Sequence, residues 1–269
     1  MIDLHAHLLP EVDDGPDSMR EAVAMSRAAL EAGIRTVVCT PHMIEHYPTD
    51  PARVHRGVAE LREALAAAGV PLEVLPGGEI ALSWLSHLGD EELRLASLGG
   101  GGRWLMLEMP FQGWPLALPR AIADLEIRGY GVILAHPERA ESIQRAPDRI
   151  RDLVGRGALV QLTAGSFTGD HGAAARRTAA LLLAGGMAHL LASDAHSAGP
   201  WRGPELEPGL MAAADAVDVH PQALRWMVDD GPRAVLEGRP VRPPRLTPAR
   251  RPPAVARPER GGRRQPTRR

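Results

Sequence analysis

The sequence predicts an α/β fold built on a parallel sheet, arranged as a barrel of fewer than eight strands. The first observation is that predicted strands and helices alternate about seven times with short connections, which is typical of parallel strands joined by crossover helices. The second is that side chains able to bind a metal follow nearly every strand. Sites in the loops after many strands are typical of a barrel, whereas a doubly wound sheet gathers its function at one switch point.

The composition is that of one large globular α/β domain with an aliphatic core. Of the 269 residues 44% are hydrophobic and 24% charged, while aromatic residues make up only 3%. Cys39 is the only cysteine, so an internal disulfide and a cysteine-rich zinc site are excluded. It is not followed by the arginine of a Cys-x5-Arg loop, the motif of thiol phosphatases, and its apolar neighbours predict a buried strand position. We find no signal peptide and no apolar run of membrane-spanning length, and therefore expect a cytoplasmic protein.

Charge divides the chain into a folded domain over residues 1–239 and a basic tail over residues 240–269. The tail has ten Arg, eight Pro and one Glu, for a net charge of +9, whereas residues 1–239 carry −11. A segment so rich in Pro and Arg has little to bury, and we expect it to be disordered. It could contact nucleic acid or anionic lipid, but a solvated extension is the favoured interpretation and no specific nucleic acid partner is expected.

The first element is a strand at residues 2–4 that ends in His5 and His7. Strand side chains two residues apart point the same way, so the two imidazoles face one point. An acidic turn containing Asp13 and Asp14 follows. A helix is predicted next, over residues 17–33, capped by Asp17 or Ser18 and ended by Gly33.

The remaining elements continue the alternation. The predicted strands are β-branched or apolar runs at residues 35–40, 72–75, 104–107, 131–135, 159–163 and 189–192. The predicted helices cover residues 51–68, 116–128, 148–156, 173–184, 205–216 and 221–229. We expect residues 165–169 to form a loop and residues 230–233 a turn before the tail.

Nine metal-ligand residues, five His and four carboxylates, follow six of the strands. They are His5, His7, Asp14, His42, Glu79, Glu108, His136, Asp194 and His196. One hydrolytic metal uses three or four protein ligands, so nine suit two or three metals with a bridging carboxylate. Nitrogen and oxygen donors without thiolate suit Mn, Fe or Zn. Such centres hydrolyse esters by lowering the pKa of bound water.

Other polar residues near these strand ends allow alternatives. Arg139 and Arg202 could face a phosphoryl group, for which bidentate arginine is the best side chain. Asp13 competes with Asp14 as a ligand, and Asp3 could orient a ligating imidazole. Gln161, Thr163 and Ser166 could support ligands, but satisfied loop groups are favoured. His46 and Tyr47 could line the mouth of the site, but facing water is the favoured interpretation for loop residues, and we expect the other histidines to lie outside the site.

The loop motifs resemble the PHP (polymerase and histidinol phosphatase) superfamily. They are His5-Ala-His7, Thr40-Pro-His42, Glu79, Glu108, Ala135-His-Pro-Glu-Arg139 and Ser193-Asp-Ala-His196. The opening Asp3-Leu-His-Ala-His7 with Val12-Asp-Asp-Gly15 narrows the resemblance to the bacterial manganese-dependent protein-tyrosine phosphatases encoded with capsular and exopolysaccharide genes. The resemblance covers residues 1–239 and excludes the tail.

The resemblance implies a distorted (β/α)7 barrel, TIM-like, that holds three divalent metals, most often Mn. One metal would be held by His5, His7, Glu79 and Asp194, the second by Glu79, Glu108 and His136, and the third by Asp14, His42 and His196. Arg139 and Arg202 match arginines that the family uses on the phosphoryl group. The substrate implied is an autophosphorylating tyrosine kinase that regulates polysaccharide chain length, with hydrolysis by a metal-bridged hydroxide.

Three other functions stay open from the sequence. The nearest is a small-molecule phosphoesterase of the same superfamily, acting on histidinol phosphate or nucleotide phosphates. A metal-dependent amidohydrolase is disfavoured, because that class often uses a carboxylated Lys and this chain has none. A regulatory module with a nucleic-acid-binding tail is disfavoured by the complete set of nine ligands.

Overall fold

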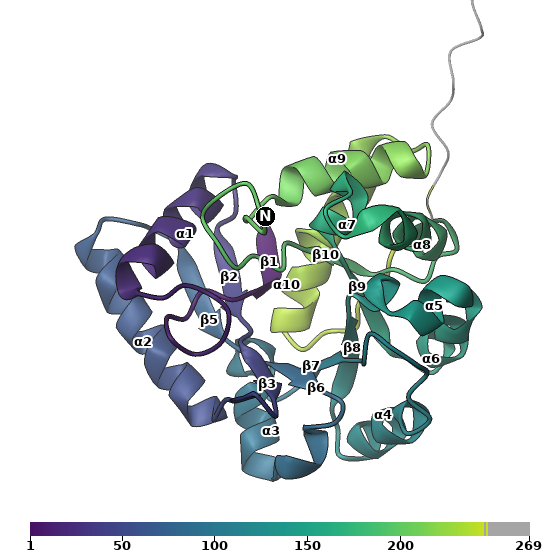
Figure 1. The fold of residues 1–269 in the computed structure, drawn as a ribbon, viewed down its shortest axis with the longest axis horizontal. Helices are drawn as coiled ribbons and strands as arrows, with labels where there is room; N and C mark the ends of the chain where they lie inside the picture. The colour runs from purple at the N-terminus through teal and green to yellow at the C-terminus, as the bar shows by residue number, and fades with distance from the viewer. Residues whose placement is uncertain (245, 247–269) are drawn as a thin grey trace, which may run out of the picture.

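The computed structural model describes residues 1–244 and residue 246, and it is an α/β fold with helices around the outside of the strands (Figure 1). The strands are β1 (Ile2–Ala6), β2 (Thr36–Cys39), β3 (His42–Ile44), β4 (Tyr47–Pro48), β5 (Glu73–Pro76), β6 (Glu79–Ala81), β7 (Trp104–Glu108), β8 (Gly131–Ala135), β9 (Leu159–Thr163) and β10 (Leu190–Ala192). The α-helices are α1 (Met19–Glu31), α2 (Pro51–Ala67), α3 (Asp90–Ala96), α4 (Leu118–Ile127), α5 (Glu141–Arg145), α6 (Arg151–Gly155), α7 (Ala164–Thr168), α8 (Gly172–Ala184), α9 (Leu206–Ala216) and α10 (Asp230–Leu236). Five 3-10 turns, η1 to η5, cover Leu85–His87, Leu98–Gly100, Pro137–Arg139, Pro147–Ile150 and Pro221–Met227.

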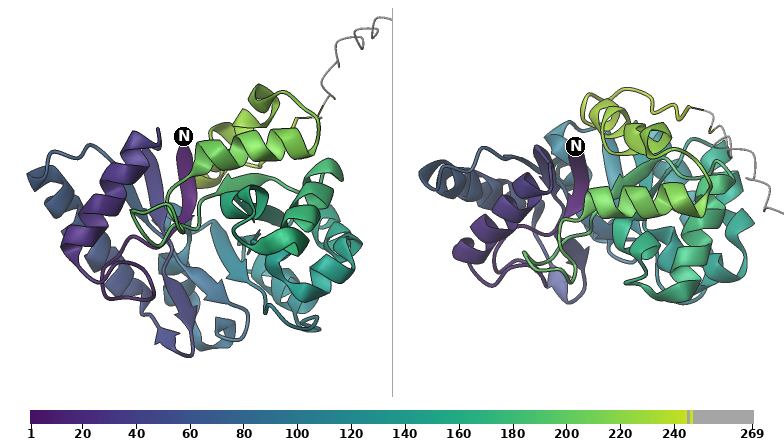
Figure 2. Two further views of the ribbon diagram at one scale, coloured as in Figure 1. Left: turned by 45° about the horizontal axis from the view of Figure 1, so that its top comes forward. Right: turned by 90° about the horizontal axis from the view of Figure 1, so that it is seen from above.

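The strands pair in two sheets, in the orders β1-β2-β5 and β10-β9-β8-β7-β6-β3-β4. All of these pairs are parallel except the hairpin β3–β4, which confirms the predicted α/β class with a parallel sheet. Figure 2 shows α1 and α2 on one side of the strands and α7 to α9 on the other. Parallel strands place their carboxyl ends at one edge, which is where the candidate site lies.

The chain passes from one sheet to the other at two short interruptions in its strands. β2 is followed after Thr40 and Pro41 by β3, and β5 is followed after Gly77 and Gly78 by β6. A single parallel bridge, Ala6 with Ala195, links β1 to the segment after β10. The strand contacts thus follow the order that a ring of seven strands requires, with interruptions in the ladder. Closure into a distorted (β/α)7 barrel stays a prediction.

The two glycines between β5 and β6 are required by close packing. A Cβ at Gly78 would lie 2.4 Å from Cε of Met43, and one at Gly77 would lie 2.7 Å from Cγ1 of Val38. Both neighbours are fully buried, so neither has free space to move into. The backbone can therefore pass here, and bring Glu79 to the sheet edge, only without side chains at these two positions.

The core is aliphatic, as the composition predicts. The apolar residues of the central strands are buried, among them Leu105, Leu107, Ile133 and Leu134, and Cys39 is buried as expected. The helices bury one face against these strands. α1 begins as predicted, because the Ser18 side chain accepts a hydrogen bond from the Glu21 backbone N–H at 3.3 Å.

Several boundaries differ from the sequence-based expectation. The expected turn at residues 230–233 is wrong, because Gly231 and Pro232 lie in the first turn of α10, where a proline leaves no intrahelical donor missing. The expected loop after β9 is instead the short helix α7. The expected helix at residues 148–156 is a 3-10 turn followed by α6, and the one at residues 221–229 is the 3-10 helix η5.

The predicted tail falls mostly outside the described residues. Residues 240–244 and 246 have no helix or strand, and the remainder of residues 240–269 is not described. The disorder of the tail and the domain boundary at residue 239 therefore stay predictions. None of the helices in the described part of the chain is long and apolar enough to cross a membrane.

A buried histidine outside the candidate site makes stability depend on pH. His189 is 6% exposed, its Nδ1 accepts the Val160 backbone N–H at 3.1 Å, and burial lowers its pKa to about 4. Its pKa in the unfolded chain is higher, near 6.5. Protonation of His189 therefore favours the unfolded state as the pH falls below about 6.5. The resulting loss of stability levels off once the pH is below the folded pKa of about 4.

We expect His189→Gln, which keeps an acceptor but cannot titrate, to remove part of this pH dependence. In urea unfolding with a chelator present, the free energy of unfolding between pH 7 and pH 4.5 should fall by roughly 2–3 kcal/mol more in the wild type than in the variant. Equal losses in the two proteins would show that His189 is not buried in its neutral form.

Candidate metal centre

All nine predicted ligands lie together at the carboxyl ends of the strands. His5 is on β1, His42 begins β3, Glu79 begins β6 and Glu108 ends β7, while the others lie in the loops that follow β1, β8 and β10. Their donor atoms form overlapping groups in which all atoms lie within 4.8 Å of one another. The groups are His5/His7/Asp194, His5/Glu79/His136, His42/Glu79/Glu108 and His7/Asp14/His42/His196.

The imidazoles of His5 and His7 lie at ligand spacing from each other and from the same two carboxylates. His5 Nε2 lies 3.3 Å from His7 Nε2, 3.4 Å from Glu79 Oε2 and 3.5 Å from Asp194 Oδ1. His7 Nε2 lies 3.6 Å from the same Glu79 oxygen and 3.5 Å from the same Asp194 oxygen. Ligands about 2.1 Å from a central ion are about 3.4 Å apart in a tetrahedron. Glu79 Oε2 and Asp194 Oδ1 each complete a triangle of ligand spacing with the two imidazoles, and the four side chains are those that the resemblance implies for the first metal.

The shared carboxylate of Glu79 has an oxygen without a donor. Glu79 is 1% exposed, and its Oε2 accepts no hydrogen bond from the described residues, although His42 Nδ1 lies 2.8 Å away without the alignment of one. An unsatisfied buried carboxylate oxygen is unfavourable, and a cation removes this penalty. The unsatisfied atom and its spacing from the His5 and His7 nitrogens both fit a bound metal.

The other groups differ in part from the sets that the resemblance implies. His136 Nε2 lies 2.8 Å from Glu79 Oε1 but 3.9 Å from Glu108 Oε1, and Glu108 is grouped with Glu79 and His42 instead. The third set is present, since His196 Nε2 lies 3.1 Å and His42 Nε2 3.5 Å from Asp14 Oδ1. Glu79 belongs to two groups, as a bridging ligand must.

The imidazoles are held so that Nε2 faces the cluster. His5 Nδ1 contacts Gln161 Oε1 at 2.9 Å, His7 Nδ1 contacts Asp13 Oδ2 at 2.6 Å, and His196 Nδ1 contacts its own loop's Asp194 carbonyl at 2.8 Å. Partners on Nδ1 fix the tautomer and raise the basicity of the ligand nitrogen. Asp13 is thus occupied by His7 Nδ1 and the His42 backbone N–H, whereas Asp14 faces the His42 and His196 imidazoles.

Two expectations about supporting residues were wrong and one was right. Gln161 is not a satisfied loop group, since it lies in β9 and orients His5; a polar residue inside an apolar predicted strand was the available signal. Asp3 orients no imidazole and instead accepts hydrogen bonds from the Ser193 hydroxyl and the backbone N–H groups of Ser193 and His5. Ser166 is a satisfied polar group, since its hydroxyl donates to Glu138 at 2.8 Å.

Protons balance the negative charge of the cluster in the metal-free protein. Burial opposes protonation of His5, but the facing Glu79 and Asp194 outweigh it and raise the His5 pKa to about 10. Burial and the neighbouring Glu79 charge raise the pKa of Glu108 to about 8. The surrounding imidazoles overcome burial and hold the pKa of Glu79 well below its usual range. Metal binding must displace these protons and therefore weakens in acid.

Both predicted arginines reach the cluster. Arg139 Nη1 donates to Asp194 Oδ2 at 2.7 Å, and Arg202 Nη1 donates to Asp14 Oδ2 at 2.9 Å while its other terminal nitrogen contacts His196 Nε2. Arg202, His136 and Asp194 have φ values of 52°, 28° and 55°, which non-glycine residues rarely adopt. Such backbone strain is often found at functional sites.

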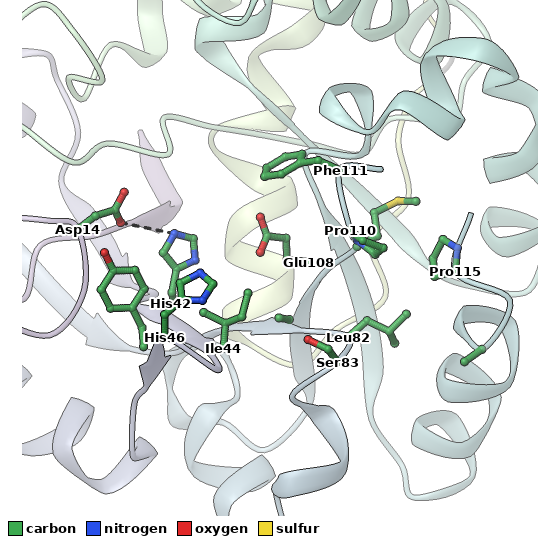
Figure 3. Close-up of a pocket in the computed structure, with 14 residues that line it drawn as sticks. Asp14, His42, Ile44, His46, Leu82, Ser83, Glu108, Pro110, Phe111 and Pro115 are labelled. Atoms are coloured by element: carbon green, nitrogen blue, oxygen red, sulfur yellow. Dashed lines mark ion pairs between the residues drawn. The ribbon is translucent and has the colours of Figure 1, made fainter. Parts of the chain in front are cut away.

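A cavity of about 760 Å³ opens beside the cluster (Figure 3). Asp14, His42 and Glu108 line it, and Figure 3 shows Glu108 between His42 and Phe111. His46 and Tyr47, at the β3–β4 hairpin, line it as well, so the expectation that they only face water was wrong.

Comparisons with known proteins agree on one family. The family model described as "Capsular polysaccharide synthesis, CpsB/CapC" matches residues 1–237. The chain is 35% identical to the tyrosine-protein phosphatase YwqE of Bacillus subtilis (strain 168), over 73% of this chain and 78% of that one. It is 25% identical to the tyrosine-protein phosphatase CpsB of Streptococcus pneumoniae, over 73% and 83%. A solved structure from work on YwqE and CpsB, described as metal-dependent tyrosine phosphatases, matches with 30% identity and a TM-score of 0.79, covering 93% of this chain and 100% of that one.

Proposed function

Since the chain belongs to the capsular polysaccharide synthesis CpsB/CapC family, we propose that it is a metal-dependent protein-tyrosine phosphatase. The observation that carries the proposal is the set of donors on His5, His7, Glu79 and Asp194 at ligand spacing around the two imidazoles, with Arg139 bound to Asp194. Phosphate monoester hydrolysis needs such a centre together with cationic side chains. The names of the relatives support tyrosine as the phosphorylated residue.

Each group of residues has a role in this proposal. The nine ligands hold up to three divalent metals, with Mn preferred and Fe or Zn also suited to the donors. When bound, the metals would lower the pKa of a coordinated water and neutralise charge on the phosphoryl oxygens. Arg139 and Arg202 bind and orient the phosphoryl group from two sides of the cluster, and Asp13 and Gln161 keep the imidazoles in position. Cys39 is buried and takes no part.

We further propose the setting in which this activity operates. The substrate is the phosphotyrosine of an autophosphorylating bacterial tyrosine kinase that controls exopolysaccharide or capsule synthesis, as the family resemblance suggests. The location is the cytoplasm, which agrees with a single cysteine left as a free thiol.

The substrate class is tested by comparing three phosphate esters. The manganese-loaded protein should hydrolyse a phosphotyrosyl peptide with a higher kcat/KM than histidinol phosphate or a nucleoside monophosphate. A preference for either small molecule would favour the alternative, a small-molecule phosphoesterase of the same fold. Turnover of none of the three would contradict phosphatase function.

Removal of metal should abolish activity and lower stability together. A chelator is expected to eliminate hydrolysis of p-nitrophenyl phosphate, and added Mn should restore it. Metal at about 100 times its Kd should also stabilise the fold by about 2.7 kcal/mol, seen as a higher urea midpoint. Full activity in protein that elemental analysis shows to be metal-free would contradict a metal mechanism.

A further inference from the structure

The cavity beside the candidate metal centre is mostly apolar away from the edge it shares with that centre, where His46, Tyr47 and Ser83 are the other polar lining residues. Asp14, His42 and Glu108 belong to both. Most of the remaining wall is apolar and includes Ile44, Leu82, Met109, Pro110, Phe111 and Pro115 (Figure 3). A ligand held at the metal centre could therefore extend directly into an apolar space.

The charged side chains of the site indicate where the anionic and uncharged parts of such a ligand would lie. Arg139 and Arg202 contact the acidic side chains of the cluster, and of the described residues that line the cavity none is an arginine. The anionic part of a ligand is thus favoured at the arginines and the uncharged part in the cavity.

Phe111 is placed to contact that uncharged part. It lines the cavity and is 43% exposed, although a large apolar side chain is more stable when covered. Its ring stacks on the imidazole of His136, with centroids 6.0 Å apart and an interplanar angle of 17°, and the Arg139 guanidinium lies 4.9 Å from its centroid. These contacts fix the ring next to two residues of the proposed site.

Resting on the proposed function, we propose that the cavity binds the aryl ring of the phosphate ester and that Phe111 selects aryl over alkyl phosphates. A benzene molecule occupies a cavity of about 150 Å³. The cavity here, about 760 Å³, therefore also takes the side chain of a residue next to the phosphotyrosine. The apolar wall, with Ile44, Leu82 and Met109, favours an apolar side chain for that neighbour.

The test compares the wild type with Phe111→Leu, which keeps an apolar side chain but loses the ring, and with Phe111→Tyr, which restores it. Ile127→Ala, at an 85% exposed position on α4, is the matched control. In the manganese-loaded proteins we would measure kcat/KM for a phosphotyrosyl peptide and for the same peptide with phosphoserine. Calorimetry would give Kd for an arylmethyl phosphonate, an alkyl phosphonate and inorganic phosphate.

We expect Phe111→Leu to lower kcat/KM for the phosphotyrosyl peptide about tenfold, because an aromatic pair is lost. Kd for the aryl phosphonate should rise by a similar factor, with no change for the phosphoseryl peptide, the alkyl phosphonate or phosphate. Ile127→Ala should behave like the wild type, and Phe111→Tyr should recover most of the aryl preference that Phe111→Leu loses. An equal loss for aryl and alkyl ligands and for phosphate would overturn the proposal, since Phe111 would then act only by positioning Arg139.

The failure of this proposal is distinguishable from failure of the proposed function. If the wild type hydrolyses neither peptide, phosphatase function is contradicted, but the ratio of aryl to alkyl phosphonate Kd still tests the cavity. Turnover of the phosphotyrosyl peptide with an unchanged ratio in Phe111→Leu would contradict the aryl site while leaving the phosphatase function intact.

Discussion

Replacing Glu79 with Gln is expected to eliminate phosphatase activity and to remove more than one metal from the protein. Glu79 Oε2 lies within 3.6 Å of both His5 Nε2 and His7 Nε2, while Oε1 lies 2.8 Å from His136 Nε2. One carboxylate therefore serves two groups of donors, and the amide can replace neither its charge nor its second oxygen. Replacing a residue that only supports a metal ligand typically lowers metal affinity or activity by about 10–100-fold, so loss of a shared ligand should lower kcat by more than about 100-fold.

The measurement pairs kcat for p-nitrophenyl phosphate with the metal content per protein. Glu63→Gln, which also removes one carboxylate but from an exposed position of α2, is the control and should match the wild type. Because Glu79 is buried, its loss leaves positive charge on nearby imidazoles unbalanced, so urea unfolding must show that the variant is folded. A folded Glu79→Gln protein with the wild-type metal content and kcat would exclude the proposed bridging role.

The positions of the ligands could be predicted from the sequence because they depend on topology alone. Parallel strands place their carboxyl ends together, so a polar residue at each strand end, such as His5, Glu108 or His136, must meet the others. That inference needs only the end of each strand. It does not need the packing of side chains, and it succeeded for residues as distant in sequence as His5 and Asp194.

The residues behind the ligands could not be found in this way. Whether Gln161 reaches His5 Nδ1 depends on the register of β9 relative to β1, which are not neighbours in either sheet. Asp3 lies on the same face of its strand as His5, but its carboxylate accepts hydrogen bonds from two backbone N–H groups and the Ser193 hydroxyl instead of from an imidazole. Register and competition for hydrogen bonds are tertiary properties, and local sequence pattern contains neither.

The cavity was missed for a related reason. Its walls come from the β3–β4 hairpin, from residues that follow β6, and from residues 109–117 after β7, all of which are irregular or very short segments. No periodicity marks such segments, and a sequence gives no reason to expect Tyr47 and Phe111 on the border of one space. The cavity could therefore be found only from the structure, whereas the gathering of the nine candidate ligands could be predicted from the sequence.

Replacing Arg139 with Met should lower kcat by roughly 10²–10³-fold, the loss typical of removing one donor to a developing negative charge. In the structure Arg139 donates to Asp194 Oδ2 at 2.7 Å, so it lies at the edge of the donor group that Asp194 forms with His5 and His7, and its guanidinium is held over Phe111. Met retains the length and the apolar contact but not the charge. Arg139→Lys retains the charge but not the paired donors, and should recover only part of the activity.

The control for Arg139 separates a role in phosphoryl binding from one in holding Asp194. Metal content should stay at the wild-type level in Arg139→Met, while Kd for inorganic phosphate rises, because the ligand Asp194 keeps its contacts with His5 and His7. Arg145→Met, at an exposed position of α5, should change neither the metal content nor the Kd for phosphate. If Arg139→Met instead loses metal and binds phosphate in proportion to the metal that remains, Arg139 positions Asp194 and does not act on the phosphoryl group.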